Sequence, residues 1–245
     1  MKFRICGAIL FVAFAFVASA WADEVGSSTI VLQLPHGRVT AEVFNRAGAE
    51  KRPAIVVLHG AGGTLFDGPE MRRVARYLAT AGNTVYVVHY FERTGSIFAV
   101  DSTMQKNFAT WLETVRESIA AIQAMRADQS KVGIYGYSLG GFLALAAASD
   151  NPRVAAVVEH AGGIWNNEFA RVGRMPPVLM IHGEEDGRVP VAKYTRPLIP
   201  VLRRHAARLE TRFFPGEGHV FTQSAMVKVR AAAAEWFRRS LVARR

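Results

Sequence analysis

Apolar positions along the chain form short runs that alternate with longer amphipathic stretches. The short runs contain few polar residues, which is the pattern of strands buried on both faces of a sheet. They cover residues 54–58, 84–88, 132–135, 154–158, 178–181 and 209–214. Helical periodicity covers about residues 69–81, 107–127, 139–149, 190–206 and 222–242. This alternation predicts an α/β domain with a mostly parallel central sheet and helices on both faces.

The residues before this alternation have a different pattern. Two β-rich stretches, residues 29–34 and 38–44, flank Pro35-His36-Gly37 and predict an N-terminal antiparallel hairpin. In parallel sheets the reactive groups lie on loops at the carboxyl ends of the strands. Residues 92–107 are predicted to form one such loop, either lining a substrate pocket or connecting elements at the surface.

The first 22 residues have the organisation of a secretory signal peptide. Lys2 and Arg4 precede an apolar run over residues 5–17, and small residues follow at 18–22. The run is about 13 residues long, whereas a spanning helix needs roughly 20, so a membrane anchor is the less favoured alternative. Cleavage fits after residue 20 or after residue 22, and the acidic pair that follows favours residue 22. We expect one periplasmic or secreted domain over residues 23–245, without stable membrane insertion.

Composition narrows the possible chemistry. Cys6, the chain's one cysteine, lies in the expected signal peptide, so the mature chain would have no disulfide, thiol nucleophile or thiolate metal ligand. The formal charge is +10, but the arginines are spread out and not interleaved with aromatic residues. A solvated surface is therefore favoured over a nucleic-acid site. No metal-ligand spacing links the histidines His36, His89, His160, His182 and His205.

The candidate nucleophile is Ser138, in the sequence Gly136-Tyr-Ser-Leu-Gly140 between a predicted strand and a predicted helix. G-x-S-x-G in this setting indicates a nucleophile elbow. The serine stands there on a sharp, strained turn, and side chains at positions 136 and 140 would collide with the flanking elements. The alternative is an ordinary serine N-cap at a tight junction.

Two further segments provide partners for this hydroxyl, which is a weak nucleophile without an oriented base. His219 lies in a glycine-flanked loop after the last predicted strand and is the candidate general base. Asp186 lies in the loop after the preceding strand and is the candidate acid, with Glu184 and Glu185 as rivals. The order serine, aspartate, histidine along the chain is that of the α/β-hydrolase fold.

A glycine-rich segment, His59-Gly-Ala-Gly-Gly63, follows the first buried strand. Its small residues let backbone N–H groups approach a ligand, and we expect Ala61, or else Gly62, to form an oxyanion hole with the amide of Leu139. His59 itself is expected to be structural. The alternatives are an ordinary turn or a phosphate cradle, but neither a P-loop ending nor the spaced glycines of a dinucleotide fingerprint is present.

With these segments together, the chain resembles the dienelactone hydrolase family of α/β hydrolases over nearly all of its mature length. Gly-Tyr-Ser138-Leu-Gly-Gly is similar to that family's Gly-Tyr-Cys-Leu-Gly-Gly, and the segments around Asp186 and His219 match its pattern. The founding enzymes differ in having cysteine at the nucleophile position and glutamate at the position of Gly60. That glutamate helps to control ionisation of the cysteine, so losing both together is a coherent change to a serine triad.

The resemblance implies an α/β-hydrolase fold and a serine esterase that cleaves a small ester through a Ser138, His219 and Asp186 triad and an acyl-enzyme. We expect no cofactor, no metal and no nucleic-acid partner; the substrate is a small ester or lactone. The alternatives are a dienelactone-type lactone hydrolase, a prolyl-oligopeptidase-like peptidase and a non-catalytic binding domain. The sequence leaves the acyl and alcohol groups and the oligomeric state open.

Overall fold

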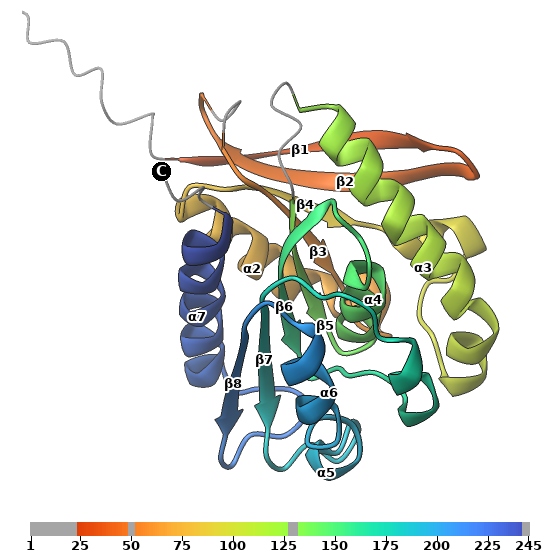
Figure 1. The fold of residues 1–245 in the computed structure, drawn as a ribbon. Helices are drawn as coiled ribbons and strands as arrows, with labels where there is room; N and C mark the ends of the chain where they lie inside the picture. Colours follow the sequence, from red (N-terminus) through yellow and green to blue (C-terminus); the bar gives the residue numbers. More distant parts are fainter. Residues whose placement is uncertain (1–23, 49–51, 127–131, 242–245) are drawn as a thin grey trace, which may run out of the picture.

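An eight-stranded sheet runs through the computed structural model, which describes residues 24–48, 52–126 and 132–241 (Figure 1). The strand order is β1-β2-β4-β3-β5-β6-β7-β8. β2 is antiparallel to β1 and β4, and all pairs from β4 to β8 are parallel. The strands are β1 (Val25–Leu34), β2 (Gly37–Arg46), β3 (Ala54–Leu58), β4 (Thr84–Val88), β5 (Val132–Tyr137), β6 (Val154–His160), β7 (Val178–Gly183) and β8 (Leu209–Phe214). The expected signal peptide, residues 1–22, lies outside the described residues.

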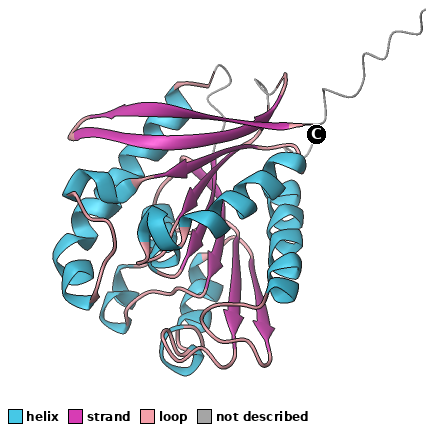
Figure 2. Ribbon diagram, turned by 180° about the vertical axis from the view of Figure 1, so that it is seen from behind, coloured by secondary structure: helices cyan, strands magenta, loops and turns pink. Residues whose placement is uncertain are grey.

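Helices cover both faces of this sheet (Figures 1 and 2). In chain order the helical elements are α1 (Gly63–Phe66), α2 (Gly68–Thr80), η1 (Tyr90–Thr94), α3 (Asp101–Ala124), α4 (Leu139–Ala148), η2 (Asn166–Arg171), α5 (Val191–Tyr194), α6 (Leu198–His205) and α7 (Gln223–Leu241). One face packs against α3, α4 and α6, and the other against α2 and α7. In the described part of the chain, no helix combines the length and the hydropathy needed to span a bilayer.

The strand residues divide alternately between two cores. In β3, Val56 and Leu58 lie under α3 and α4, whereas Ile55 and Val57 lie under α2 and α7. This alternation follows from the two-residue period of a strand, because successive side chains point to opposite faces. Both faces are buried, so the strands need apolar residues at every position. The continuous apolar runs in the sequence have this origin.

The predicted fold class is confirmed: the sheet is mostly parallel, has an antiparallel hairpin at its start, and carries helices on both faces. Two helix predictions need correction. α3 begins at Asp101, within the predicted loop 92–107. Residues 101–108 contain two large apolar residues, Met104 and Phe108, both only partly buried, and therefore carry little apolar periodicity. The helix predicted over 190–206 is split into α5 and α6. Pro197 causes the break, since the residue before a proline is disfavoured in a helix.

Trp236 on α7 is a large side chain in the core under α2 and α7, with no exposed surface. We expect Trp236→Ala to lower the free energy of unfolding by about 3–5 kcal/mol, because it leaves a cavity that the core cannot fill. Urea unfolding measures the effect. Val227→Ala on the same helix is the control, since Val227 is 56% exposed and its truncation should cost under about 0.5 kcal/mol. Equal losses in both variants would contradict this core assignment.

Candidate active site

Ser138 lies at the sharp junction between β5 and α4. Its backbone has φ 53°, a left-handed conformation that is costly for a residue with a side chain. The turn is close-packed: a Cβ on Gly136 would collide with the Gly140 carbonyl, and one on Gly140 would collide with the Leu58 carbonyl. The Ser138 N–H donates to the His160 carbonyl at 2.8 Å, which ties the turn to the end of β6. These are the features expected of a nucleophile elbow.

The structure brings Ser138, His219 and Asp186 into one line of hydrogen bonds. Ser138 Oγ lies 2.9 Å from His219 Nε2, and His219 Nδ1 lies 2.8 Å from Asp186 Oδ2. With the Nδ1–H tautomer, the histidine donates to the carboxylate and accepts the serine O–H. Ser138 and Asp186 are buried, whereas the His219 side chain is 18% exposed. A base oriented in this way can take a proton from the hydroxyl.

Asp186 is held by the turn in which it lies. Its Oδ1 accepts the backbone N–H groups of Arg188 and Val189 at 2.9 and 2.7 Å, which leaves Oδ2 for the histidine. The rivals Glu184 and Glu185 are exposed. Their side chains face solvent, and the carboxylate that reaches His219 comes from Asp186.

Backbone hydrogen bonds join the acid loop to the histidine loop. Glu185 N–H donates to the Glu217 carbonyl at 3.0 Å, so the segments before Asp186 and His219 lie side by side. The Glu217 carboxylate in turn accepts the N–H and the hydroxyl of Thr222, at 2.7 and 2.6 Å, just before α7. The position of the histidine is thus set by β7, β8 and the start of α7 together.

The glycine-rich segment after β3 lies against the elbow, but one of its predicted donors is already bonded. The Gly62 N–H donates to Asp67 Oδ2 at 3.0 Å. The Ala61 carbonyl accepts the Ala99 N–H at 2.8 Å, which orients the peptide groups around Ala61. Leu139 provides the first amide of α4, where no acceptor exists within the helix. The geometry thus favours Ala61 over Gly62 as the loop donor.

Asp67 is a site residue that the sequence analysis missed. A Cβ placed on Gly60 would lie 2.7 Å from Asp67 Oδ2 and 3.0 Å from Ser138 Cβ, so this carboxylate lies close to the elbow. Burial raises the pKa of Asp67, although hydrogen bonds from the amides of Gly62 and Gly60 oppose the shift. An aspartate just before Gly68-Pro69 at a helix start was the available signal.

A second histidine contacts the carboxylate that orients His219. His182 Nε2 lies 3.3 Å from Asp186 Oδ2 and 2.9 Å from the Val189 carbonyl, and Thr195 bonds its other ring nitrogen. Burial alone would raise the pKa of Asp186, but hydrogen bonds from His182 and His219 outweigh burial and hold it well below its usual range. The carboxylate therefore stays ionised between two imidazoles.

Glu159, at the end of β6, is a buried carboxyl group that the sequence analysis also missed. Its Oε1 accepts the Gly162 N–H, and its Oε2 has no hydrogen-bond partner among the described residues. Burial raises the pKa of Glu159 to about 7. The turn it braces includes Ala161 at φ 53° and the His160 carbonyl that accepts the Ser138 N–H. A lone glutamate at the end of an apolar run was the signal in the sequence.

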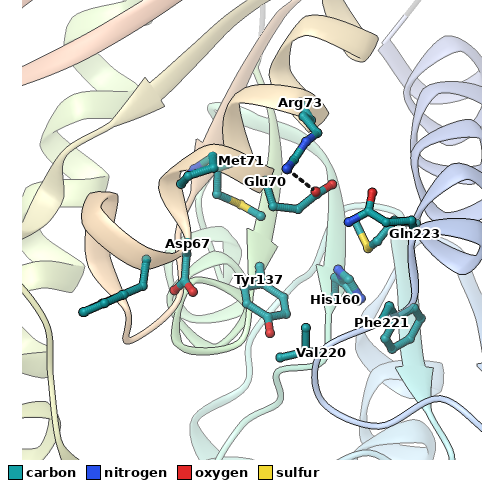
Figure 3. A pocket seen from close by; sticks show the side chains of 12 residues that line it. Asp67, Glu70, Met71, Arg73, Tyr137, His160, Val220, Phe221 and Gln223 are labelled. Atoms are coloured by element: carbon teal, nitrogen blue, oxygen red, sulfur yellow. Dashed lines mark hydrogen bonds and ion pairs between the residues drawn. The ribbon is translucent and has the colours of Figure 1, made fainter.

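A pocket of about 290 Å³ lies beside these groups (Figure 3). Tyr137 and Val220, the chain neighbours of Ser138 and His219, line it. The Tyr137 hydroxyl donates to the His219 carbonyl at 3.1 Å, so its ring is fixed against the histidine loop. The other walls come from α1, from the start of α2, from His160 at the end of β6 and from residues at and just before the start of α7.

Two further histidines, His59 and His36, lie outside the line of hydrogen bonds formed by Ser138, His219 and Asp186. His59 is fully buried and stacks on Tyr90, and burial lowers its pKa to about 4, in keeping with the expected structural role. His36 lies near Glu113 and Glu117 of α3, a grouping with the geometry to hold a cation that histidine spacing did not reveal. Arg93 pairs with both glutamates and partly neutralises them.

The buried position of Glu159 makes the stability of the fold depend on pH. Its folded pKa of about 7 exceeds the ordinary 4.5, so the folded chain holds the proton more tightly between these values. The free energy of unfolding therefore falls as pH rises through this window. Glu159→Gln keeps the shape without the charge, and we expect its stability relative to wild type to increase from about pH 5 to about pH 8. Urea unfolding at several pH values measures this difference.

Loss of the Glu159 charge also weakens the upward shift in the pKa of His182, to which Glu159 contributes. A histidine with a raised pKa loses its contribution to the free energy of unfolding as pH rises. With a smaller shift in the variant, less of this free energy is lost, so the stability of Glu159→Gln relative to wild type again increases with pH. Glu185→Gln, at an exposed position, is the control and should show no such pH-dependent difference. A difference between Glu159→Gln and wild type that stays constant over the range would refute the buried titration.

Comparison with solved structures places the fold among the α/β hydrolases. A dienelactone hydrolase-like promiscuous phosphotriesterase from metagenomic libraries is 20% identical, with a TM-score of 0.73 over 88% of this chain and 99% of the other. A putative dienelactone hydrolase from Klebsiella pneumoniae is 16% identical, with a TM-score of 0.73 and the same coverage. A lidless α/β serine hydrolase from Xanthomonas campestris is 20% identical, with a TM-score of 0.67 over 89% and 97% of the two chains.

Comparison at the level of sequence families gives a direct assignment. No curated protein matches the chain. The family model described as the dienelactone hydrolase family matches residues 39–242, a range that contains the elbow, the acid loop and the histidine loop. The predicted resemblance is thereby confirmed, and the chain belongs to the dienelactone hydrolase family of α/β hydrolases.

Proposed function

We propose that this protein is an exported serine esterase that cleaves a small carboxylic ester through an acyl-enzyme on Ser138. The observation that carries the proposal is the line of hydrogen bonds from Ser138 through His219 to Asp186, set on a strained elbow. A binding domain has no use for an oriented base beside an otherwise weak nucleophile. Membership of a hydrolase family supports the same reading.

In the first half of the reaction, His219 Nε2 takes the proton of Ser138 while Oγ bonds to the ester carbonyl carbon. The carbonyl oxygen becomes an oxyanion, for which the amides of Leu139 and Ala61 are the proposed donors. When the intermediate collapses, the bond to the alcohol oxygen breaks and His219 returns its proton to the leaving alcohol. The acyl group remains on Ser138.

In the second half, water replaces the alcohol. His219 removes a proton from the water as its oxygen attacks the acyl carbon, and collapse releases the acid and restores the Ser138 hydroxyl. Asp186 stays ionised throughout and stabilises the imidazolium formed in each half. The depressed pKa of Asp186 supports this role, since the carboxylate keeps its charge at any pH at which the histidine can act as base.

Export is the second part of the proposal. Residues 1–22 serve as the signal peptide, and the mature domain over residues 23–245 acts in the periplasm or outside the cell. A mature chain without cysteine suits an oxidising compartment, because no thiol is open to oxidation there. Hydrolysis of a dienelactone-type lactone is the second candidate activity, which the family match favours.

The nucleophile is tested by covalent labelling. A fluorophosphonate should add to the wild-type protein, with the added mass found on Ser138 by peptide mapping, because the oriented base makes this hydroxyl reactive. Ser138→Ala should abolish both labelling and hydrolysis of an aryl acetate. Ser149→Ala, outside the site at the end of α4, is the matched control and should label normally. Undiminished labelling of Ser138→Ala would end the assignment.

The acid is tested by removing its charge. Asp186→Asn should fold normally, since the amide keeps the shape, yet lower kcat by up to about four orders of magnitude through the wrong histidine tautomer. Steady-state turnover of an aryl acetate, with circular dichroism as the check on folding, gives the result. Glu184→Gln and Glu185→Gln are the controls and should keep near-normal turnover. If Asp186→Asn kept its turnover while one glutamate variant lost it, that glutamate would be the acid in place of Asp186.

A further inference from the structure

Exposed apolar side chains gather beside the glycine-rich segment, and one of them, Phe66, also lines the pocket. Leu65 and Phe66 at the end of α1 are 60% and 67% exposed, and Ile97 and Phe98 before α3 are 65% and 56% exposed. We call these four residues the apolar lip. The rings of Phe66 and Phe98 are in edge contact, with centroids 6.5 Å apart. Large apolar side chains left together in water indicate a surface that meets an apolar group.

The lip is built onto the glycine-rich segment beside the elbow. The Ala99 N–H donates to the Ala61 carbonyl, so residues 97–99 lie directly over the segment that holds the proposed oxyanion donor. The Ile97 carbonyl lies so near Gly63 that no side chain fits there. The lip is therefore fixed against the glycine-rich segment that holds the proposed oxyanion donor.

The lip continues into the pocket through Phe66, which belongs to both. The pocket walls also include Met71, Phe221 and Met226, together with Val220, which is 80% exposed. Methionine and aromatic side chains adapt to alkyl and aryl groups. The volume of about 290 Å³ is just below the usual range for whole small-molecule ligands, so the pocket suits one arm of a substrate.

The charges in the pocket disfavour an anionic substrate. Among the described residues that line it, Arg73 is the one cation, and it pairs with Glu70 at 3.0 Å. Arg230 pairs with the other oxygen of Glu70 at 2.6 Å. Asp67 adds a carboxylate that accepts hydrogen bonds from the amides of Gly62 and Gly60. Glu70 is therefore compensated by two arginines, and within the described part of the chain Asp67 is the lining carboxylate that no arginine contacts. A substrate carboxylate placed here would be desolvated beside Asp67 while both arginines are engaged by Glu70.

We propose that the substrates are neutral esters with an apolar arm of medium length that fills the pocket and runs over the lip, and that carboxylate-bearing esters and lactones are poor substrates. The inference rests on the proposed esterase function and deepens it. It separates the two candidate activities by the chemistry of the pocket, since an acidic lactone would bring an uncompensated negative charge.

The test compares three substrates on the purified wild-type protein: 4-nitrophenyl acetate, 4-nitrophenyl hexanoate and the mono-4-nitrophenyl ester of adipic acid. Hexanoate and adipate have similar length and differ by one carboxylate. We expect kcat/KM for hexanoate to exceed that for adipate by at least about tenfold, since the charge loses its hydration on binding. Equal values, or a preference for adipate, would overturn the inference.

Variants locate the effect. Phe66→Ser and Phe98→Ser should each lower kcat/KM for hexanoate about tenfold, mainly through KM, and should lower kcat/KM for acetate much less. Val31→Ser, at a 54% exposed apolar position on β1, is the matched control and should change neither. Gln223→Lys, which adds a cation to the pocket lining, should narrow the gap between hexanoate and adipate.

Equal loss on acetate and hexanoate in the lip variants would overturn the inference, as would a change of oligomeric state by gel filtration without any change in chain-length preference. The second result would assign the lip to contact between two copies of the chain. Failure of the proposed function looks different: the wild-type protein then hydrolyses no acetate in a manner that depends on Ser138. Wild-type activity on acetate with a preference for adipate leaves the esterase proposal standing and removes only this inference.

Discussion

The left-handed backbone of Ser138 is the constraint on which the site depends. A residue with a side chain at φ 53° costs on the order of 1–3 kcal/mol, and such a conformation persists only where the surroundings hold it. Here the missing side chains of Gly136 and Gly140 allow the close crossing of β5, α4 and β3, and the His160 carbonyl holds the Ser138 N–H. The parallel order of β3, β5 and β6 brings these partners to one edge of the sheet, so the elbow follows from the topology.

Two buried carboxyl groups behind the elbow, those of Asp186 and Glu159, differ in how well their charge is compensated. Asp186 accepts two backbone N–H groups and faces two imidazoles, so a buried carboxylate is well compensated. Glu159 has far weaker compensation and keeps one oxygen without a partner among the described residues. A buried charge without a partner is costly, and the pKa of Glu159 therefore rises toward neutrality. The surroundings of Asp186 favour its charged form, whereas those of Glu159 favour its neutral form.

The sequence was sufficient for the fold and for the residues that now form the hydrogen-bonded line, and physical reasons explain why. Buried parallel strands have continuous apolar runs, and the elbow needs glycine at positions 136 and 140. The strands and the elbow can therefore both be recognised from short stretches of sequence. Asp67 and Glu159 were not predicted because their roles depend on burial and on the positions of Ser138 and His182, which only the fold brings near them. The start of α3 at Asp101 was missed because its first turns contain few apolar residues, none of them fully buried.

The position of Asp67 gives a physical meaning to the glycine at position 60. The founding enzymes of the family carry a glutamate there, whereas a Cβ on Gly60 in this chain would approach Asp67 Oδ2 to 2.7 Å. The space beside the elbow thus holds one carboxylate, delivered from the start of α2 in place of one from the end of β3. This carboxylate accepts the Gly62 N–H and is therefore held by the glycine-rich segment. We do not assign it the role of the family's glutamate, which helps to control ionisation of a cysteine. A neutral serine hydroxyl next to His219, which is oriented by Asp186, is consistent with this arrangement.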